Sequence, residues 1–423
     1  MRRICTLLIF FLAIRPGATF AQTDALSLTL SKAESLFLKY NYDLLASNYE
    51  IDQAKAEIIT AKLFDNPTLE YENLFYNHET KKFLQTSYAY GQYAASISQL
   101  FKLAGKRNKN IKLAQTGVKL AEYEYFDLMR TLKFELVNTF YKTYFSAQSV
   151  KLYQEQISST DQLLKAYNIQ LKMGNVATKD VIRIKSLLIN LKAEQAGLLN
   201  DLEDHYKDLK LLCGLDANIS LSLIVDQADF KNGLLDKVPY SCLLDSARAN
   251  RADLKLAKTD LLYNERNLKL QKAMAIPDIE IGLSYDLKGN YPEKYTGLGI
   301  KIPIPLFSRN QGEIKKAQVG IAAADMNIKK QEALLENEVF NSYKTALRNE
   351  KLYEEIDPAF STDFNTLISA LIKNFKARNI SLIEFLDLYD AYKENTLQLN
   401  KLQFERMSTR AELNYVTGSN IFK

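Results

Sequence analysis

The sequence predicts an α+β membrane protein: a duplicated unit whose long coiled-coil helices form an α-helical barrel and whose four strands contribute to a trimeric transmembrane β-barrel. Three observations lead to this fold class. The chain contains one structural unit written twice, its helical stretches are too long for a globule, and its few strands alternate strictly between apolar and polar residues.

The N-terminus predicts export. Arg2 and Arg3 precede an apolar run over 4–14, and a small-residue cleavage site ends at Ala21, so we assign 1–21 to a signal peptide. Loss of its three arginines lowers the formal charge from +5 to +2, a balance that argues against a nucleic-acid partner. No later segment offers the roughly 20 apolar residues that a membrane-spanning helix needs.

The repeat is carried by matching motifs. Lys172-Met173-Gly174-Asn175 aligns with Lys376-Ala377-Arg378-Asn379, and without a gap Cys213-Gly214 then falls on Thr417-Gly418. We therefore predict a first repeat over 22–213, a connection over 214–242, a second repeat over 243–418 and a tail over 419–423.

Each repeat reads as helix, β-hairpin, very long helix, turn and helix. Richness in Ala, Leu, Lys, Glu and Gln predicts helices at about 31–63, 107–172 and 178–213, and in the second copy at 310–376 and 380–417. A heptad seam runs through 181–212, which is typical of coiled-coil packing. Pro358 interrupts the second long helix and predicts a kink or a restart there.

The hairpins are predicted over 67–101 and 277–307, where side chains alternate with period two. One face is expected to meet lipid, and its residues are Ile279, Ile281, Leu283, Tyr285, Ile300 and Ile302. The opposite face is expected to line a lumen, and its residues are Glu70, Glu72, Asp278, Glu280 and Asp286.

A soluble sheet packed on helices would show the same alternation. Against it, the two hairpins hold eight of the 25 tyrosines in 66 residues, as interfacial aromatic girdles do, and the long helices leave no globular body for a sheet to cover. Membrane barrels need about eight strands or more, so four must be completed by other copies. Three copies would supply twelve.

The polar residues that could carry chemistry are few. Export permits a disulfide between Cys213 and Cys242, but we favour two separate, partly buried thiols. His205 lies in the coiled-coil seam and His78 in a loop, so neither predicts a metal site. We expect no cofactor, and the sequence shows no phosphate loop, zinc motif or nucleophile elbow.

With these features, the chain resembles the TolC family of outer-membrane efflux proteins. The resemblance rests on the duplication, the Asn66-Pro67 strand entry, the Ile302-Pro303-Ile304-Pro305 segment and the turns at Gly174 and Arg378. It covers nearly all of 22–423. The short length and Gly105-Lys106-Arg107 favour the heavy-metal efflux branch.

The resemblance implies a homotrimer in the outer membrane of a Gram-negative bacterium that extends into the periplasm. It also implies a passive exit duct for small solutes or metal cations, a periplasmic adaptor protein and an inner-membrane pump, most simply one of the RND type. The tip turns at Gly174, Asn175, Arg378 and Asn379 would dock on the adaptor. Arg378 departs from the glycine usual at that position.

The resemblance further implies a periplasmic aperture. Glu384 and Asp387 match the paired acids that follow the second turn in the family, and they share one helix face. Asp180 and Arg183 stand at the corresponding positions of the first copy, where we expect partial neutralisation, and Asp363 is a further tip acid.

Two alternatives stay open from the sequence. A type I protein-secretion duct would share the whole architecture. A periplasmic coiled-coil scaffold or adaptor would share the signal peptide and the long helices, although it would not need the aromatic hairpins.

Overall fold

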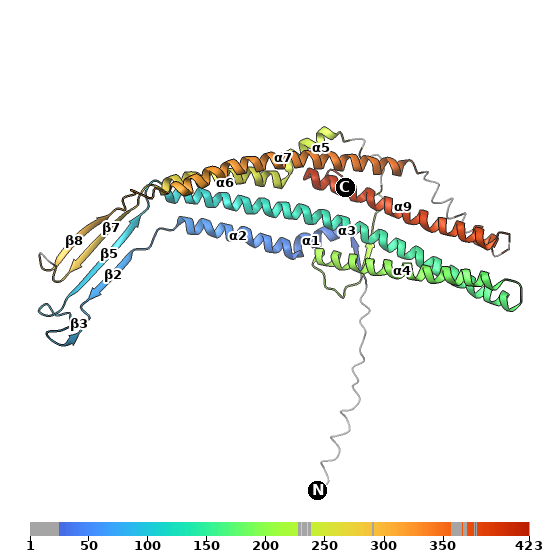
Figure 1. Ribbon diagram of the computed structural model, residues 1–423, viewed down its shortest axis with the longest axis horizontal. Coiled ribbons are helices and arrows are strands. Elements are labelled where there is room, and N and C mark those ends of the chain that lie inside the picture. Colours follow the sequence, from blue (N-terminus) through green and yellow to red (C-terminus); the bar gives the residue numbers. More distant parts are fainter. Residues whose placement is uncertain are drawn as a thin grey trace, which may run out of the picture.

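The computed structural model describes residues 25–226, 230, 235, 238–289, 292–356, 366, 370–375, 377 and 379–422. The predicted signal peptide, Pro358, Asp363 and Arg378 lie outside them. The described chain is an elongated body with a β-sheet at one end and two helical turns at the other (Figure 1).

Six helices make most of this body. The first copy has α2 (Tyr42–Lys62), α3 (Lys106–Lys172) and α4 (Thr178–Cys213), and the second has α6 (Ala252–Met274), α7 (Gln311–Glu354) and α9 (Leu382–Thr417). The 67 residues of α3 reach about 100 Å at 1.5 Å per residue. The long helices of the first copy therefore begin and end close to the predicted positions.

The helices form one open layer. In the half next to the sheet, α3 contacts α2 and α6, and α6 contacts α7; in the other half, α3 contacts α4 and α9, and α9 contacts α7 (Figure 1). Each half is thus four helices wide, with α2 and α4 at one edge and α7 at the other. The predicted seam of α4 is buried at Val181, Ile184, Leu188 and Leu191.

The sheet contains four antiparallel strands in the order β2-β5-β7-β8. These are β2 (Thr68–Asn73), β5 (Tyr93–Phe101), β7 (Ile279–Asp286) and β8 (Tyr295–Lys301). Short strands β3 (Tyr76–Asn77) and β4 (Lys82–Phe83) pair in the loop between β2 and β5. β8 stops before Pro303 and Pro305, which lack the N–H group that a ladder needs, so it is shorter than predicted.

A belt of small elements lies against the middle of the layer. It contains β1 (Leu26–Thr29), α1 (Leu30–Tyr40), β6 (Leu221–Ile224) and α5 (Tyr240–Asn250), and β1 pairs with β6 in parallel. The sequence prediction missed this ladder and treated 31–63 as one helix. Asn41 divides α1 from α2: its side chain caps α2 through the Leu44 N–H and donates to the Leu212 carbonyl.

Two glycines fix where the belt meets the helices. Gly214 and Gly418 end α4 and α9 with φ of 62° and 63°. A Cβ on Gly214 would lie 2.5 Å from the Tyr40 carbonyl oxygen, and one on Gly418 would lie 3.1 Å from the Arg251 nitrogen. In each copy the helix end therefore touches the break between two helices, which explains why both copies end in glycine.

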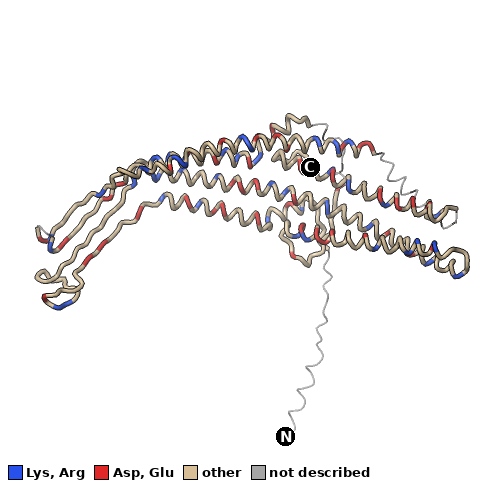
Figure 2. Tube along the Cα trace, in the orientation of Figure 1, with Lys and Arg blue, Asp and Glu red and all other residues tan. Residues whose placement is uncertain are grey.

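Two surface features bear on the environment. In the part of the chain that the structure describes, no helix is long and apolar enough to cross a membrane. Lys and Arg gather where the helices meet the sheet (Figure 2).

We predict that Gly214→Ala lowers the melting temperature of the assembled protein. The added methyl group meets the Tyr40 carbonyl and the positive φ disfavours a side chain, a combined cost of about 1–3 kcal/mol per chain. Thermal unfolding in detergent measures the change.

Gly197→Ala is the matched control, because Gly197 lies inside α4 with nothing within 4 Å of its added Cβ. It should keep or slightly raise the melting temperature. Equal losses in the two variants would show that the contact at Tyr40 is unimportant.

Candidate functional site

The sheet presents one apolar and one polar face. Leu283 pairs with Ile97 and Leu298, which makes an apolar row across three strands. Ile281 pairs with Ile300 on one side and with the polar Gln99 on the other. Leu283 and Ile300 are 56% and 65% exposed in the single chain. Ile279 and Tyr285 share this face by register, whereas Ile302 lies just beyond β8.

The polar face carries small residues and carboxylates. Glu70 pairs with Ser96, which pairs with Ser284, and Ser284 pairs with Gly297. Glu72, Glu280 and Asp286 have the same parity, and the Glu280 carboxylate lies 3.4 Å from the Lys301 ammonium. The register thus puts four of the five predicted lumen acids on one face.

Asp278 has a different environment from those four acids. It precedes β7, and its carboxylate lies 2.7 Å from the ammonium group of buried Lys106 and accepts the Leu103 N–H. Lys106 also donates to the Ile276 carbonyl. This cluster joins the first turn of α3 to the start of β7, so Asp278 holds the junction between helices and sheet. No sequence pattern marks Lys106 as its partner.

The first tip turn joins α3 to α4. Gly174 has φ 77°, the Gly174 N–H donates to the Leu171 carbonyl, and the Asn175 N–H donates to the Gln170 carbonyl. The Asn175 side chain also donates to the Gln170 side chain. Glycine ends the helix here because the left-handed backbone costs it little.

The second tip turn repeats part of this pattern. The Asn379 N–H donates to the carbonyl of Asn374, five residues earlier, as Asn175 does to Gln170. Ser381 then caps α9 by accepting the Glu384 N–H. Glu384 and Asp387 are both exposed, in the first two turns of α9.

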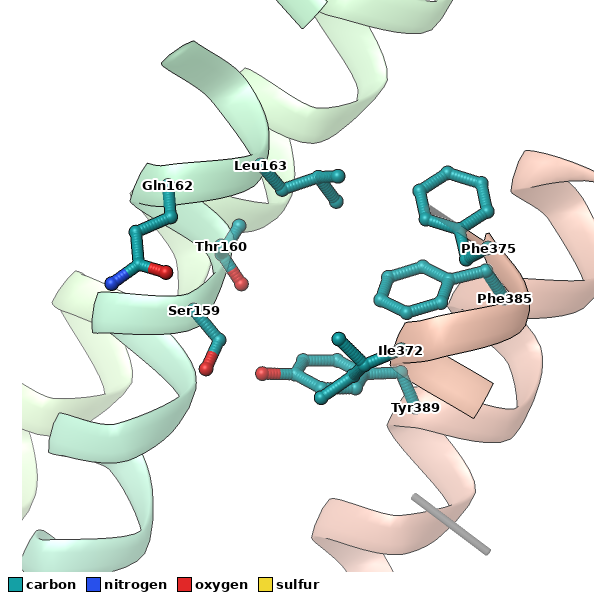
Figure 3. A pocket seen from close by; sticks show the side chains of 8 residues that line it. All are labelled: Ser159, Thr160, Gln162, Leu163, Ile372, Phe375, Phe385 and Tyr389. Carbon is teal, nitrogen blue, oxygen red and sulfur yellow. The ribbon is translucent and has the colours of Figure 1, made fainter. Parts of the chain in front are cut away.

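Glu384 and Asp387 flank a buried aromatic stack at the tip. Phe375 and Phe385 have centroids 4.3 Å apart, and Phe385 and Tyr389 lie 5.2 Å apart. Figure 3 shows the Tyr389 hydroxyl directed from α9 toward Ser159 on α3, across a cavity of about 50 Å³. The stack fixes the face of α9 that the two acids occupy.

In the first copy Asp180 is partly buried and Arg183 is exposed. Their side chains form no ion pair with each other in the described structure, although both residues are described. Arg183 therefore does not neutralise the charge of Asp180 by direct contact.

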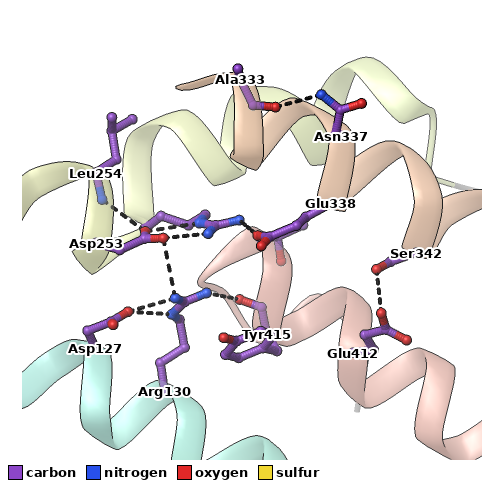
Figure 4. A network of polar contacts seen from close by, with 12 residues as sticks. Asp127, Arg130, Asp253, Leu254, Ala333, Asn337, Glu338, Ser342, Glu412 and Tyr415 are labelled. Atoms are coloured by element: carbon purple, nitrogen blue, oxygen red, sulfur yellow. Dashed lines mark hydrogen bonds and ion pairs between the residues drawn. The ribbon is translucent and has the colours of Figure 1, made fainter. Parts of the chain in front are cut away.

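The belt contains a polar network that sequence reasoning missed. Arg130 on α3 contacts Asp127 and Asp253 and donates to the Tyr415 carbonyl, whose ring it covers at 4.2 Å (Figure 4). Buried Arg251 binds Asp253 through Nε at 3.0 Å and Glu338 at 2.6 Å. The network ties α3 of the first copy to α6, α7 and α9 of the second.

The charge of Asp253 depends on its arginines. Burial alone would raise its pKa, but the hydrogen bonds and charge of Arg251, with the charge of Arg130, outweigh burial and lower the pKa.

A second buried cluster lies further along α7 and α9. Glu350 accepts from Arg406 at 2.6 and 2.8 Å and from Arg410 at 2.8 Å, and Arg406 also donates to the Phe230 carbonyl. These partners are 56 to 60 residues apart and lie on different helices, so no periodic spacing in the sequence marks them as a pair.

The cysteines are both free thiols, Cys213 buried and Cys242 exposed. Burial raises the pKa of Cys213 to about 12, which makes it a poor nucleophile. Burial also lowers the pKa of His205. Within the described residues, no group of three or more His, Cys, Asp or Glu side chains is arranged to hold a metal ion.

Comparisons with solved structures agree with this architecture. The chain superimposes on the Campylobacter jejuni CmeC outer membrane channel with a TM-score of 0.73 (15% identity, 92% of this chain and 85% of that one). It superimposes on CusC with 0.72 (16%, 94% and 94%) and on Vibrio cholerae VceC with 0.70 (14%, 93% and 96%). The chain therefore shares the fold of these three proteins.

The chain is also similar in sequence to a metal-resistance protein. The cobalt-zinc-cadmium resistance protein CzcC of Cupriavidus metallidurans is 23% identical over 378 residues, which span 88% of this chain and 85% of CzcC. No family model matches the chain.

We predict that Arg251→Gln destabilises the protein by about 3–5 kcal/mol at pH 7, because it removes a buried guanidinium and leaves the half-buried Asp253 with fewer partners. A carboxylate with a lowered pKa stabilises the fold above its unfolded pKa near 4, and this contribution disappears as the pH falls through the folded pKa. The gap in melting temperature between wild type and variant should therefore narrow below about pH 4.

Arg248→Gln serves as control, since its ion pair with Glu336 is exposed. It should change the melting temperature little at any pH. A gap for Arg251→Gln that stays constant down to pH 3 would contradict the proposed role of Asp253.

Proposed function

We propose that three copies of this chain form a passive exit duct of a tripartite efflux pump, for small solutes or metal cations. The observation that carries the proposal is the exposed apolar face of the four-stranded sheet, opposite a polar face, at the end of a helical rod about 100 Å long. A sheet of this kind fits a membrane barrel, with lipid outside and water inside.

The edges of the helical layer support assembly. Large apolar side chains are exposed at both edges of the layer, each by 56% or more. They are Tyr42, Tyr49 and Ile59 on α2 at one edge and Val319 and Met326 on α7 at the other. Val319 and Met326 are seven residues apart, the spacing of a coiled-coil seam. Joining α7 of one copy to α2 and α4 of the next would cover both edges and close the layer into a tube.

The number of copies follows from closure. Four strands and four helices per level give twelve of each in a trimer, a strand number within the range of membrane barrels. Energy for transport would come from an inner-membrane pump, with RND transporters as the favoured type. A periplasmic adaptor would dock on the tip turns at Gly174, Asn175, Arg378 and Asn379.

Metal cations are the favoured cargo. CzcC is a cobalt-zinc-cadmium resistance protein, and the proposed lumen wall of this chain carries Glu70, Glu72, Glu280 and Asp286. Rings of carboxylates attract cations.

The test compares Ile281→Arg with Ser284→Arg, which stand on opposite faces of β7. On the lipid face an arginine costs about 2–4 kcal/mol per chain near mid-bilayer, whereas on the lumen face it meets water. Ile281→Arg should therefore lower the amount of detergent-extractable trimer in the outer-membrane fraction far more than Ser284→Arg. Equal losses would refute the assignment of faces, and a wild-type chain that is soluble without detergent would refute the channel.

We also predict that Glu384 and Asp387 set the narrow point of the duct. Three copies would bring six exposed carboxylates together at the periplasmic end, where they repel one another unless cations or protons intervene. Glu384→Ala with Asp387→Ala should raise single-channel conductance and weaken block by divalent cations, with little change in trimer stability.

The control for the gate is Asp201→Ala with Glu203→Ala, which are acidic and exposed on α4, further from the tip. If the Glu384 and Asp387 double variant conducts and is blocked like wild type, the constriction lies elsewhere. Asp180 and Asp363 are then the next acids to replace.

A further inference from the structure

Basic residues concentrate at one level of the molecule, where the helices meet the sheet (Figure 2). From Thr80 to Ala121 the sequence holds eight Lys and Arg residues and no Asp or Glu. Six of the eight lie between Lys102 and Lys119, at the end of β5 and the start of α3. The level also includes Lys62 in the last turn of α2 and Lys272 in the last turn of α6.

The helix dipole does not account for this distribution. It favours cations at helix C-termini, which explains Lys62 and Lys272, but it favours acids at N-termini. α3 begins here with Lys106, Arg107 and Lys109, has no acid in its first turn and no capping side chain. Helices of both directions are thus basic at the same height, so the common factor is the level along the rod.

Lys112, one of these basic residues, lies on the side of the layer that carries the belt. Along α3, Lys112, Lys119, Phe126 and Lys133 recur every seven residues and so share one helix face. Phe126 and Lys133 line a cleft with belt residues such as Glu34 and Ile224. Lys112 therefore faces the same way as the belt.

The same argument holds for α6. Lys255, Leu262 and Lys269 recur every seven residues, and Lys255 lines that same cleft. Lys272, three residues after Lys269, shares its face. Arg266 links the two helices here by donating to the Lys112 carbonyl.

The belt side must be the outer side of a closed tube. A ring of twelve helices spaced 8–10 Å apart has a diameter of only about 30–40 Å, so belts from three copies would fill its interior. Lys112, Lys269 and Lys272 thus point outward. At 1.5 Å per residue they lie within about 10 Å of the helix ends that join the sheet.

These three side chains are exposed, and none of them makes a hydrogen bond or ion pair within the described part of the chain. Just above them stand exposed apolar residues of the sheet and its junction, among them Phe101 and Ile276. An outward band of free ammonium groups directly below an apolar wall matches the phosphate layer of a membrane leaflet.

We propose that Lys112, Lys269 and Lys272 bind the headgroups of anionic phospholipids in the periplasmic leaflet. This binding site rests on the proposed function, because it needs the sheet in a membrane. It would set the height of the tube in the bilayer, since sinking or rising would separate the ammonium groups from the phosphates.

The test uses the full-length chain, purified as a trimer in detergent. Adding phosphatidylglycerol should raise the melting temperature in a saturable way that weakens with salt, whereas phosphatidylcholine should have little effect. Lys112→Gln with Lys269→Gln should increase the half-saturating concentration of phosphatidylglycerol by about fivefold for each lysine removed.

Lys151→Gln with Lys185→Gln is the charge-matched control, at exposed positions of α3 and α4 nearer the tip. It should respond to phosphatidylglycerol like wild type. The lipid site would be overturned if the Lys112 and Lys269 variant responded to phosphatidylglycerol like wild type, or if inorganic phosphate raised the melting temperature as much as the lipid does. Neither result would affect the proposed trimer or its conductance. Failure to form a detergent-soluble trimer at all would instead overturn the proposed function.

Discussion

The constraint on which the structure depends is that β2 and β8 are edge strands. A sheet edge exposes unpaired N–H and C=O groups, and in hydrocarbon each unsatisfied group costs several kcal/mol. The apolar face between these edges suits hydrocarbon, yet the edges do not. The conflict is removed if each β2 pairs with β8 of another copy. The open helical layer has the same geometry, with edges at α2 and α4 and at α7, so one act of assembly would close both parts.

The belt then has to hold two copies of the unit in register. The chain breaks between two helices at Asn41 and again at Arg251. Gly214, at the end of α4, packs against the first break, and Gly418, at the end of α9, packs against the second; both glycines have a left-handed backbone. The two breaks differ chemically: Asn41 caps a helix, whereas Arg251 enters the ion network with Asp253 and Glu338. The duplicated geometry is therefore kept while one copy adds charge-assisted contacts, which are stronger and more directional than neutral ones.

Much of the architecture could be read from the sequence because its signals are local and periodic. The heptads of α4 and the alternation of β7 each repeat many times, so single exceptions do not obscure them. The ladder in the belt escaped because β1 and β6 have four residues each and pair across almost two hundred positions. The break at Asn41 has neither Pro nor Gly to mark it.

The polar sites show the same division. Glu70, Glu72, Glu280 and Asp286 could be assigned to one face because strand parity is fixed once the strand is recognised. Asp278 has the same parity, but it precedes the strand, and the approach of Lys106 on α3 decides its environment. Parity describes a residue inside a ladder, whereas a residue at a junction responds to whichever element arrives there. The lumen wall and the basic band below the sheet differ in the same way. The lumen acids are placed by the period of their strands, whereas the residues of the band share a level along the rod and belong to several helices.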